Sequence, residues 1–214
     1  MRHTSILAPV VVLVLAALVL GAAADAAETG KELVPKGHFK IKRPANLSKA
    51  EALTVYENIG DKIAKGYAAS GDPTAKAYRK WRRYNDAPYK SKTHGNRYLN
   101  NFANMKAAKL YGDLKKGVQM PTGAVIAKDS FTVTGDGGIF AGALSIMEKL
   151  PTGTSPKTGD WRYIMIMPDG SLFDDTHGDG ADKVGFCHGC HVAAEDHDYL
   201  YFLPDAYKRQ FLGD

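Results

Sequence analysis

The chain has 214 residues, with 28 Lys and Arg against 23 Asp and Glu, a formal net charge of +5 and a pI near 9.0. This length allows one domain, with or without a leader, and no internal repeat, low-complexity tract or linker divides the rest of the chain. The positive charge alone would permit a nucleic-acid partner, so the segments that carry it must be considered in turn.

The N-terminus has the pattern of a secretory signal peptide. A short basic start precedes an uncharged run, Ile6 to Leu20, and small residues around Ala24-Asp25-Ala26 offer a cleavage site. We therefore predict a signal peptide over 1–26, a single mature domain over 27–214, and a periplasmic location. The alternative is a retained membrane anchor, because the uncharged run approaches the roughly 20 residues that span a bilayer. Pro9 and the cleavage residues favour removal, which leaves no membrane span.

The first half of the mature chain predicts helices. Ser48-Lys49-Ala50-Glu51 is a capping box, in which the serine accepts from the N3 amide while the glutamate reaches back to the cap. Apolar residues then recur at helical spacing from Ala52 to Ile63, and this helix should end near Ser70-Gly71-Asp72-Pro73. Further helices are expected from about Thr74 to Tyr84 and from Asn96 to Tyr111.

Positive charge is concentrated between Lys76 and Arg97, where Tyr and Trp residues are interleaved. Export argues against a nucleic-acid partner for this stretch. A basic face that steers an acidic redox partner is the functional interpretation. The alternative is a solvated helix face with the aromatic rings packed beneath it.

The second half predicts strands. Ala124 to Val133 is rich in Val, Ile, Thr and Phe and ends at a Gly-rich turn. Ile139 to Leu150 is a second candidate strand, with a helix over Ala141 to Glu148 as the alternative. Trp161 to Met167 is the clearest strand, and Pro168-Asp169-Gly170 turns the chain back. The expected fold class is therefore α+β, an antiparallel β-sheet with N-terminal helices.

Both cysteines of the chain lie in one pentapeptide, Cys187-His188-Gly189-Cys190-His191, which is the C-x-x-C-H signature of covalent haem attachment. Each thiol can add across one vinyl group of a porphyrin, and the next imidazole then lies under the iron as proximal ligand. A disulfide, a zinc site and a redox dithiol are the alternatives. A zinc site would need further Cys or His at ligand spacing, and a redox dithiol a cytosolic βαβ context. We expect one covalently attached haem c, near the C-terminus, held by Cys187, Cys190 and His191.

The place of this motif indicates an open iron site. Small electron-transfer cytochromes commonly carry the motif near the N-terminus and take a later methionine as sixth ligand. Here every methionine precedes Cys187, and only residues 192–214 follow the motif. A sixth ligand must fold back from upstream, with His94 and His177 the histidine candidates, or a small molecule binds there. Helical cytochromes c prime also carry a late motif, but the predicted strands argue against their four-helix bundle.

Several segments resemble the cytochrome P-460 family, and the resemblance covers roughly Ser48 to Lys208. The matching segments are Asn96–Asn104, Met120–Phe131, Asp160–Tyr163, Met167–Gly170, Phe186–His191 and Tyr199–Pro204. The resemblance implies a mainly antiparallel sheet with helices and one c-type haem with histidine on the proximal side only. It also implies an exported protein that forms a homodimer.

Enzymatic members of that family tie a strand lysine to the porphyrin edge and oxidise hydroxylamine, and the matching lysine here is Lys128. On a two-residue period Lys128 shares its face with Ala124 and Ile126, so its amine could lie over an apolar haem pocket. Desolvation there would lower its pKa and supply the neutral amine that covalent chemistry requires. The alternatives are a solvent-facing lysine beside Asp129 and a lysine in a structural ion pair.

Some enzymatic relatives also place an acid above the open iron face, shortly before the haem motif. Asp182 is the nearest positional match, beside Asp179, and could accept protons as hydroxylamine is oxidised. An ordinary polar loop is the alternative. The sister branch, cytochrome c prime-beta, lacks the cross-link and binds gases such as nitric oxide beneath an apolar cap. Candidates for such a cap are Phe131, Phe140 and Met147.

Three functions remain open from the sequence. The first is an exported mono-haem redox enzyme that oxidises a small nitrogen compound such as hydroxylamine and passes electrons to a soluble redox protein. The second is a non-enzymatic cytochrome that binds nitric oxide. The third is a simple electron carrier with an upstream methionine or histidine as sixth ligand.

Overall fold

A computed structural model describes residues 44–178 and 181–210, with the backbone alone for 181 and 182. These residues belong to the unit Lys31–Asp214. The predicted signal peptide, 1–26, and Asp179 lie outside the described residues. Within the described ranges, no helix combines the length and the apolar character that crossing a bilayer would require.

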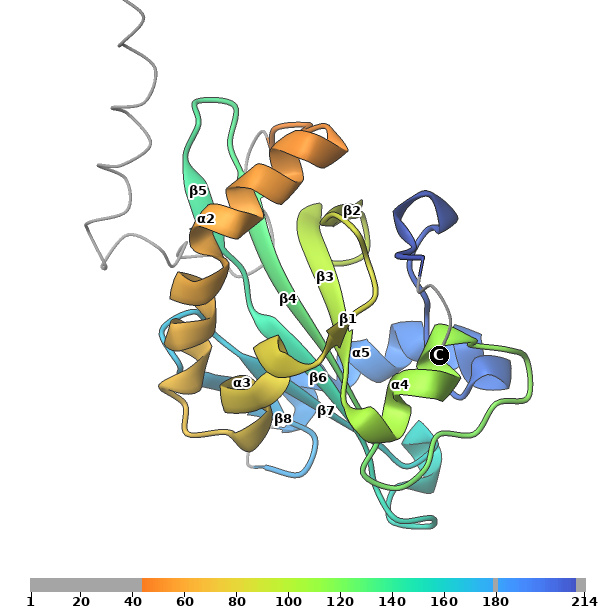
Figure 1. Ribbon diagram of the computed structural model, residues 1–214. Coiled ribbons are helices and arrows are strands. Elements are labelled where there is room, and N and C mark those ends of the chain that lie inside the picture. The colour runs from red at the N-terminus through yellow and green to blue at the C-terminus, as the bar shows by residue number, and fades with distance from the viewer. Residues whose placement is uncertain (1–43, 179–180, 211–214) are drawn as a thin grey trace, which may run out of the picture. The chain divides into compact units, whose positions relative to one another are not determined.

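The fold is built on one antiparallel sheet, with eight strands among the described residues (Figure 1). The main path runs β1-β3-β4-β6-β7-β8, while β2 pairs with β3 and β5 with β4. The strands are β1 (Arg82–Arg83), β2 (Tyr89–Ser91), β3 (Arg97–Ala103), β4 (Val125–Val133), β5 (Ile139–Ala141), β6 (Leu144–Lys149), β7 (Trp161–Ile166) and β8 (Leu172–Asp175). The expected α+β class and antiparallel sheet are confirmed.

Helices cover both faces of this sheet. The α-helices are α2 (Lys49–Ala68), α3 (Pro73–Ala77), α4 (Met105–Gly112) and α5 (Gly185–His191), and the 3₁₀ turns are η1 (Tyr78–Lys80), η2 (Pro156–Thr158), η3 (Ala181–Val184), η4 (Val192–His197) and η5 (Asp205–Tyr207). In Figure 1, α2 lies in front of the sheet and α5 behind it. The haem motif and the longest helix are therefore on opposite faces.

Strand register assigns each side chain to one of these faces. Lys128 on β4 pairs with Asn101 on β3 and with Ser145 on β6, and Ser145 in turn pairs with Met165 on β7. Because directly paired residues point to the same side, these side chains share the face that α5 covers. The alternate residues of β4, such as Phe131, face α2 and join its core.

The capping box predicted at Ser48 is present. The Ser48 amide donates to Glu51 Oε2 at 2.7 Å and the Glu51 amide to Ser48 Oγ at 3.3 Å. The helix ends at Ala68, close to the expected stop, and buries Tyr56, Ile63 and Tyr67 against the sheet. The sequence was sufficient to predict this helix, because the capping box, the spacing of the apolar residues and the Gly and Pro residues after it all indicate the same boundaries.

Two helix predictions in the first half are wrong. The helix expected from Thr74 to Tyr84 is shorter, since β1 begins at Arg82. The helix expected from Asn96 to Tyr111 is a strand, β3, followed by α4, whose cap Asn104 accepts from the Ala107 amide at 3.1 Å. All seven residues of β3 are buried, so the strand shows no polar alternation in its sequence.

The strand predictions of the second half are confirmed at β4 and β7. The segment from Ile139 to Leu150 forms β5 and β6, so the helical alternative over Ala141 to Glu148 is wrong. The Gly-rich turn after Val133 and the turn at Pro168-Asp169-Gly170 both connect antiparallel strands.

The basic stretch from Lys76 to Arg97 is spread over helix and strands rather than along one helix face. Tyr78, Tyr84 and Tyr89 are buried in the core, and Arg97 is only 7% exposed. A single solvated basic helix face is therefore absent from these described residues, whereas the aromatic rings do pack inward.

Candidate haem site

A cavity of about 800 Å³ separates the Lys128 face of the sheet from α5 and the chain that follows it. This volume falls in the range of about 300–1,000 Å³ typical of ligand and cofactor pockets. The sheet contributes mostly apolar side chains to the lining. The loop after β2, helix α5 and the segment after α5 complete it. The lining residues are Tyr89, Lys90, Ser91, Lys92, Thr93, His94, Ile126, Lys128, Ser145, Ile146, Met147, Tyr163, Ile164, Met165, Phe186, Cys187, Gly189, Cys190, His191, Ala193, Tyr201, Phe202, Leu203 and Pro204.

Helix α5 presents the haem motif to this cavity. Cys187 and Cys190, three residues apart on a helix, lie on one side of it, and both are free thiols. Burial raises the pKa of the Cys187 thiol to about 12. A redox dithiol needs the opposite, a lowered pKa that populates the thiolate. The thiol pair thus suits haem attachment better than disulfide exchange.

His191 is oriented by a hydrogen bond from its far ring nitrogen. Its Nδ1 lies 2.6 Å from the Tyr199 carbonyl oxygen. Because a carbonyl can only accept, Nδ1 carries the hydrogen and Nε2 keeps its lone pair. Burial, with the charge of Lys128, lowers the pKa of His191 to about 4. A neutral imidazole held through Nδ1 is the form in which histidine binds metals.

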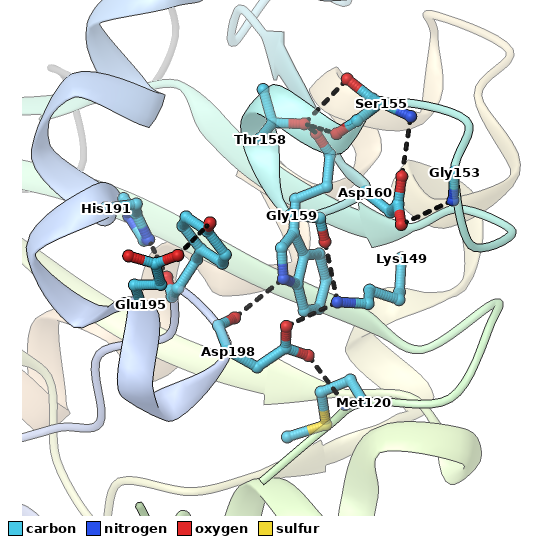
Figure 2. Close-up of polar contacts among 12 residues, drawn as sticks. Met120, Lys149, Gly153, Ser155, Thr158, Gly159, Asp160, His191, Glu195 and Asp198 are labelled. Carbon is cyan, nitrogen blue, oxygen red and sulfur yellow. Dashed lines mark hydrogen bonds and ion pairs between the residues drawn. The ribbon is translucent and has the colours of Figure 1, made fainter. Parts of the chain in front are cut away.

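The Tyr199 carbonyl is presented by a turn that sequence reasoning missed (Figure 2). Asp198 is 2% exposed, its carboxylate lies 2.5 Å from Lys149 Nζ, and its carbonyl accepts from Trp161 Nε1 at 2.8 Å. No sequence pattern joins residues this far apart, so only their burial and mutual contacts reveal the cluster.

Lys128 lies in the same cavity as the motif and is 7% exposed. Burial lowers the pKa of its amine to about 8. Among the described residues, no hydrogen bond or ion pair engages this amine. The solvent-facing alternative is therefore wrong, and the two-residue period places the side chain correctly. The neighbouring Asp129 is fully buried on the opposite face, where Tyr56 donates to its Oδ2 at 2.5 Å.

The residues of the cavity fit a haem. Tyr163 is 2% exposed, and its hydroxyl has no hydrogen-bond partner among the described residues. The residue itself lines the cavity, and a buried hydroxyl without a partner beside such a space is one sign of a missing ligand. A porphyrin is a broad apolar ring with a polar rim, and it would fill this space. The thiols of Cys187 and Cys190 and the neutral imidazole of His191 are the groups that would hold it.

The cytochrome P-460 family model matches residues 75–202, more than half of the chain. The chain belongs to the cytochrome P-460 family. No curated protein matches it. The matched segment includes β3 to β8, the cavity lysine and the whole haem motif. Membership makes the chain a haem-binding cytochrome of the c type, with iron as its metal.

His94 and His177 are the histidines predicted as possible sixth ligands of the iron. Of these two, only His94 lines the cavity of about 800 Å³. Its Nδ1 lies 2.9 Å from Ser91 Oγ, and burial, with the charges of Lys128 and His191, lowers the pKa of the His94 ring to about 3. His177 is exposed and lines neither described cavity. A second chamber of about 310 Å³ adjoins the first and shares its His94 wall.

Two further expectations are corrected. Phe131 faces α2, stacks with Tyr98 at 5.4 Å between ring centroids, and so cannot cap the cavity. Phe140 lines neither described cavity, whereas Met147 lines the larger one. His188, the inner histidine of the motif, is half-buried between the rings of Tyr163 and Tyr199.

Asp182 belongs by its backbone to η3, directly before α5. Its side chain lies outside the described residues, so its role as proton acceptor stays a prediction.

Proposed function

We propose that this cytochrome carries one haem c, covalently held by Cys187 and Cys190 with His191 as proximal ligand. We propose further that it oxidises hydroxylamine, or a similarly small nitrogen compound, at an open iron face. The observation that carries this proposal is the buried Lys128 amine in the same cavity as the motif. A carrier of electrons has no use for a partly neutral amine there, whereas a modified porphyrin does.

When bound, the haem would supply an iron that holds the substrate nitrogen and accepts electrons one at a time. Removing two electrons and two protons from NH₂OH leaves HNO. The electrons pass to an external one-electron acceptor, a soluble redox protein. The protons must be taken up by side chains of this chain or by water.

Lys128 is the residue that would tie the porphyrin edge to the sheet. Forming a bond from Nζ to a porphyrin carbon replaces one N–H and one C–H, so two protons and two electrons leave. Hydrogen peroxide can accept them and become two molecules of water. The lowered pKa of Lys128, about 8, supplies the free amine lone pair that this bond requires.

Asp182 is the proposed proton acceptor. Its backbone belongs to η3, in the residues just before α5, and a carboxylate there could take up the protons released as hydroxylamine is oxidised. His94 also lines the cavity, but burial lowers the pKa of its ring to about 3, which makes it a weak base.

The second candidate is a gas-binding cytochrome, which the chamber beside the haem cavity favours. Its wall combines the apolar side chains of Leu99, Ala143 and Met165 with the polar ones of Thr93, His94, Arg97, Ser130 and Ser145, and its volume of about 310 Å³ is ample for a small molecule such as nitric oxide. The third candidate is an electron carrier in which His94, Met147 or Met165 supplies a sixth ligand, since all three line the cavity.

Export to the periplasm, a soluble electron-accepting partner and a homodimer belong to the same proposal. The N-terminal leader and the family resemblance support them.

The intact mass and absorption spectrum of the purified haem protein test the cross-link. We expect a mass equal to chain plus haem less two hydrogens, with a Soret band unlike that of ordinary c-type haem. Lys128→Gln should restore the two hydrogens and the ordinary band. Lys90→Gln is the matched control, because Lys90 lines the same cavity but donates to Asn46 Oδ1 at 2.6 Å. A wild-type mass without the loss would favour the gas-binding candidate.

Carbon monoxide separates the remaining alternative. The reduced protein should bind it with a clear spectral change, because the iron face is open. An unchanged spectrum would show a sixth ligand from the protein and favour the electron carrier.

A further inference from the structure

The turn that holds His191 is strained at two consecutive residues. Asp198 has φ of 54° and Tyr199 has φ of 63°. Left-handed backbone is tolerated by aspartate but is unfavourable for a bulky aromatic residue. Such a turn persists only when contacts around it fix its conformation.

Those contacts come from the sheet and from the loop before β4. The Asp198 carboxylate accepts from Lys149 Nζ at 2.5 Å and from the Met120 amide at 2.7 Å. Trp161 Nε1 donates to the Asp198 carbonyl at 2.8 Å. Lys149 and Trp161 are paired across β6 and β7. One pair of neighbouring strand residues therefore binds both the carboxylate and the backbone carbonyl of Asp198. Figure 2 shows Lys149 and Met120 on the side of the Asp198 carboxylate.

The other end of the turn acts on the imidazole. Tyr199 donates its amide to the Ala194 carbonyl at 2.9 Å, and its own carbonyl accepts from His191 Nδ1 at 2.6 Å. Gly159 leaves room for the Tyr199 ring, since a Cβ there would lie 2.0 Å from Tyr199 Cε2. A shift of the Asp198 backbone would therefore move the carbonyl that orients the ring.

We infer that Asp198 is a positioning residue for His191. Its buried carboxylate, paired with Lys149, fixes the turn whose carbonyl sets the direction and the strength of the hydrogen bond to the imidazole. This inference rests on the proposed ligation by His191, but not on the Lys128 cross-link or on any substrate.

The expected consequence follows from the chemistry of ligand imidazoles. A strong hydrogen bond from Nδ1 makes the ring a better donor to the metal and stabilises the oxidised iron. When the turn relaxes, the bond from iron to histidine weakens and the reduction potential rises. A purely structural role would lower thermal stability without moving either quantity.

The chain offers a matched control in Asp160. It also has a left-handed backbone, with φ of 60°, and its carboxylate accepts from the amides of Gly153 and Ser155 at 2.9 Å and 2.7 Å. Figure 2 shows that contact apart from His191. Asp160→Ala removes a turn-stabilising carboxylate that bonds to neither Asp198 nor Tyr199, while the neighbouring Gly159 keeps its contact with the Tyr199 ring.

The experiment compares the haem-loaded wild type with Asp198→Ala, Asp198→Asn and Asp160→Ala. The measurements are the iron–histidine stretching frequency of the reduced protein by resonance Raman, the reduction potential and the thermal midpoint. We expect Asp198→Ala to lower the frequency and raise the potential. Asp160→Ala should lower only the thermal midpoint. Asp198→Asn keeps an acceptor for the Met120 amide and tolerates the left-handed backbone, so it should shift both quantities less, in the same direction.

Unchanged frequency and potential in both Asp198 variants would overturn the inference and leave Asp198 a structural residue. If Asp198→Ala fails to load haem, the test rests on Asp198→Asn. An unshifted iron–histidine stretching frequency in Asp198→Asn would then overturn the inference. Absence of an iron–histidine stretch in the wild type would instead overturn the proposed ligation itself. Failure of the inference and failure of the proposed function are thereby distinguished.

Discussion

Lys128 and Asp129 are neighbours on β4, but they point to opposite faces of the sheet and meet different surroundings. Asp129 is fully buried and accepts from Tyr56, Tyr78 and Asn100. Lys128 is nearly as buried, yet no described residue pairs with its amine. Burial opposes ionisation on both sides, raising the pKa of Asp129 and lowering that of Lys128. A buried ionisable group with hydrogen-bond partners is typical of a structural role in the fold. A buried ionisable group without partners that faces a cavity is typical of a binding or catalytic site.

The largest effect is expected on the cavity face, at the thiols. Replacing both Cys187 and Cys190 by serine should abolish covalent haem, because serine hydroxyls form no thioether with the vinyl groups. The measurement is haem absorption that survives denaturing electrophoresis. The double substitution Cys187→Ser, Cys190→Ser should leave none, and haem retained at the wild-type level would contradict the assigned attachment.

On the opposite face, Asp129→Ala should destabilise the fold strongly. It leaves two buried hydroxyls and one amide without an acceptor, at a cost of about 3–5 kcal/mol in unfolding free energy. Urea unfolding followed by circular dichroism measures this loss, while the haem spectrum of the folded protein should stay unchanged. Asp129→Asn, which keeps an acceptor oxygen, should lose much less. A haem spectrum altered as in Lys128→Gln would show that the two faces are not separate in role.

The sequence predicts those parts of this contrast that depend on residues close together in the chain. It does not predict the parts that depend on residues distant in the chain. The capping box at Ser48 and the alternation of β4 are local, so α2 and the face of Lys128 follow from the pattern. The same period, applied to Phe131, would have placed that ring on the other face. Asn100 and Asn101 make β3 look unlike a buried strand in the sequence. Both are buried because they donate to residues distant in sequence, Asp129 and Tyr111.

The proximal side of the site was less predictable. The motif itself gives Cys187, Cys190 and His191, but the hydrogen bond that orients His191 depends on a turn fixed by Lys149 and Trp161. These contacts form only when the sheet and the C-terminal segment pack together. Likewise, His94 reaches the cavity through a hairpin loop whose path no local signal determines.

The pH dependence of stability tests the contrast between the two faces at Lys128. A free amine has its folded pKa lowered from 10.5 to about 8, so between these values the unfolded chain binds the proton and the folded chain does not. The unfolding free energy of haem-free wild type, taken relative to haem-free Lys128→Gln at each pH, should therefore rise across this window by about 3 kcal/mol. Urea titrations at several pH values measure the slope.

The haem-loaded protein should show no such rise, because a cross-linked Lys128 nitrogen no longer titrates there. Haem-free Lys128→Gln is the control, because it keeps every other titrating group, including the Cys187 thiol, and lacks only the amine. A slope of equal size in haem-loaded wild type would mean that the amine is free and the cross-link absent.

The smallest effect is expected for an ion pair that belongs to neither face. Lys116 Nζ lies 2.9 Å from Asp196 Oδ2, and both side chains are well exposed. Lys116→Ala should leave the unfolding free energy close to that of the wild type, since water and salt screen such pairs. Thermal unfolding and the haem spectrum should both match the wild type. A large loss would show that exposed charges contribute more to this fold than the buried networks suggest.

Catalysis at the cavity face is tested most directly by the steady-state reduction of a soluble one-electron acceptor by the haem-loaded protein, with hydroxylamine as the only reductant. We expect turnover by the wild type and by Lys90→Gln, and loss of turnover in Lys128→Gln. Fully haem-loaded wild type that binds carbon monoxide but reduces no acceptor would contradict a catalytic role for this face.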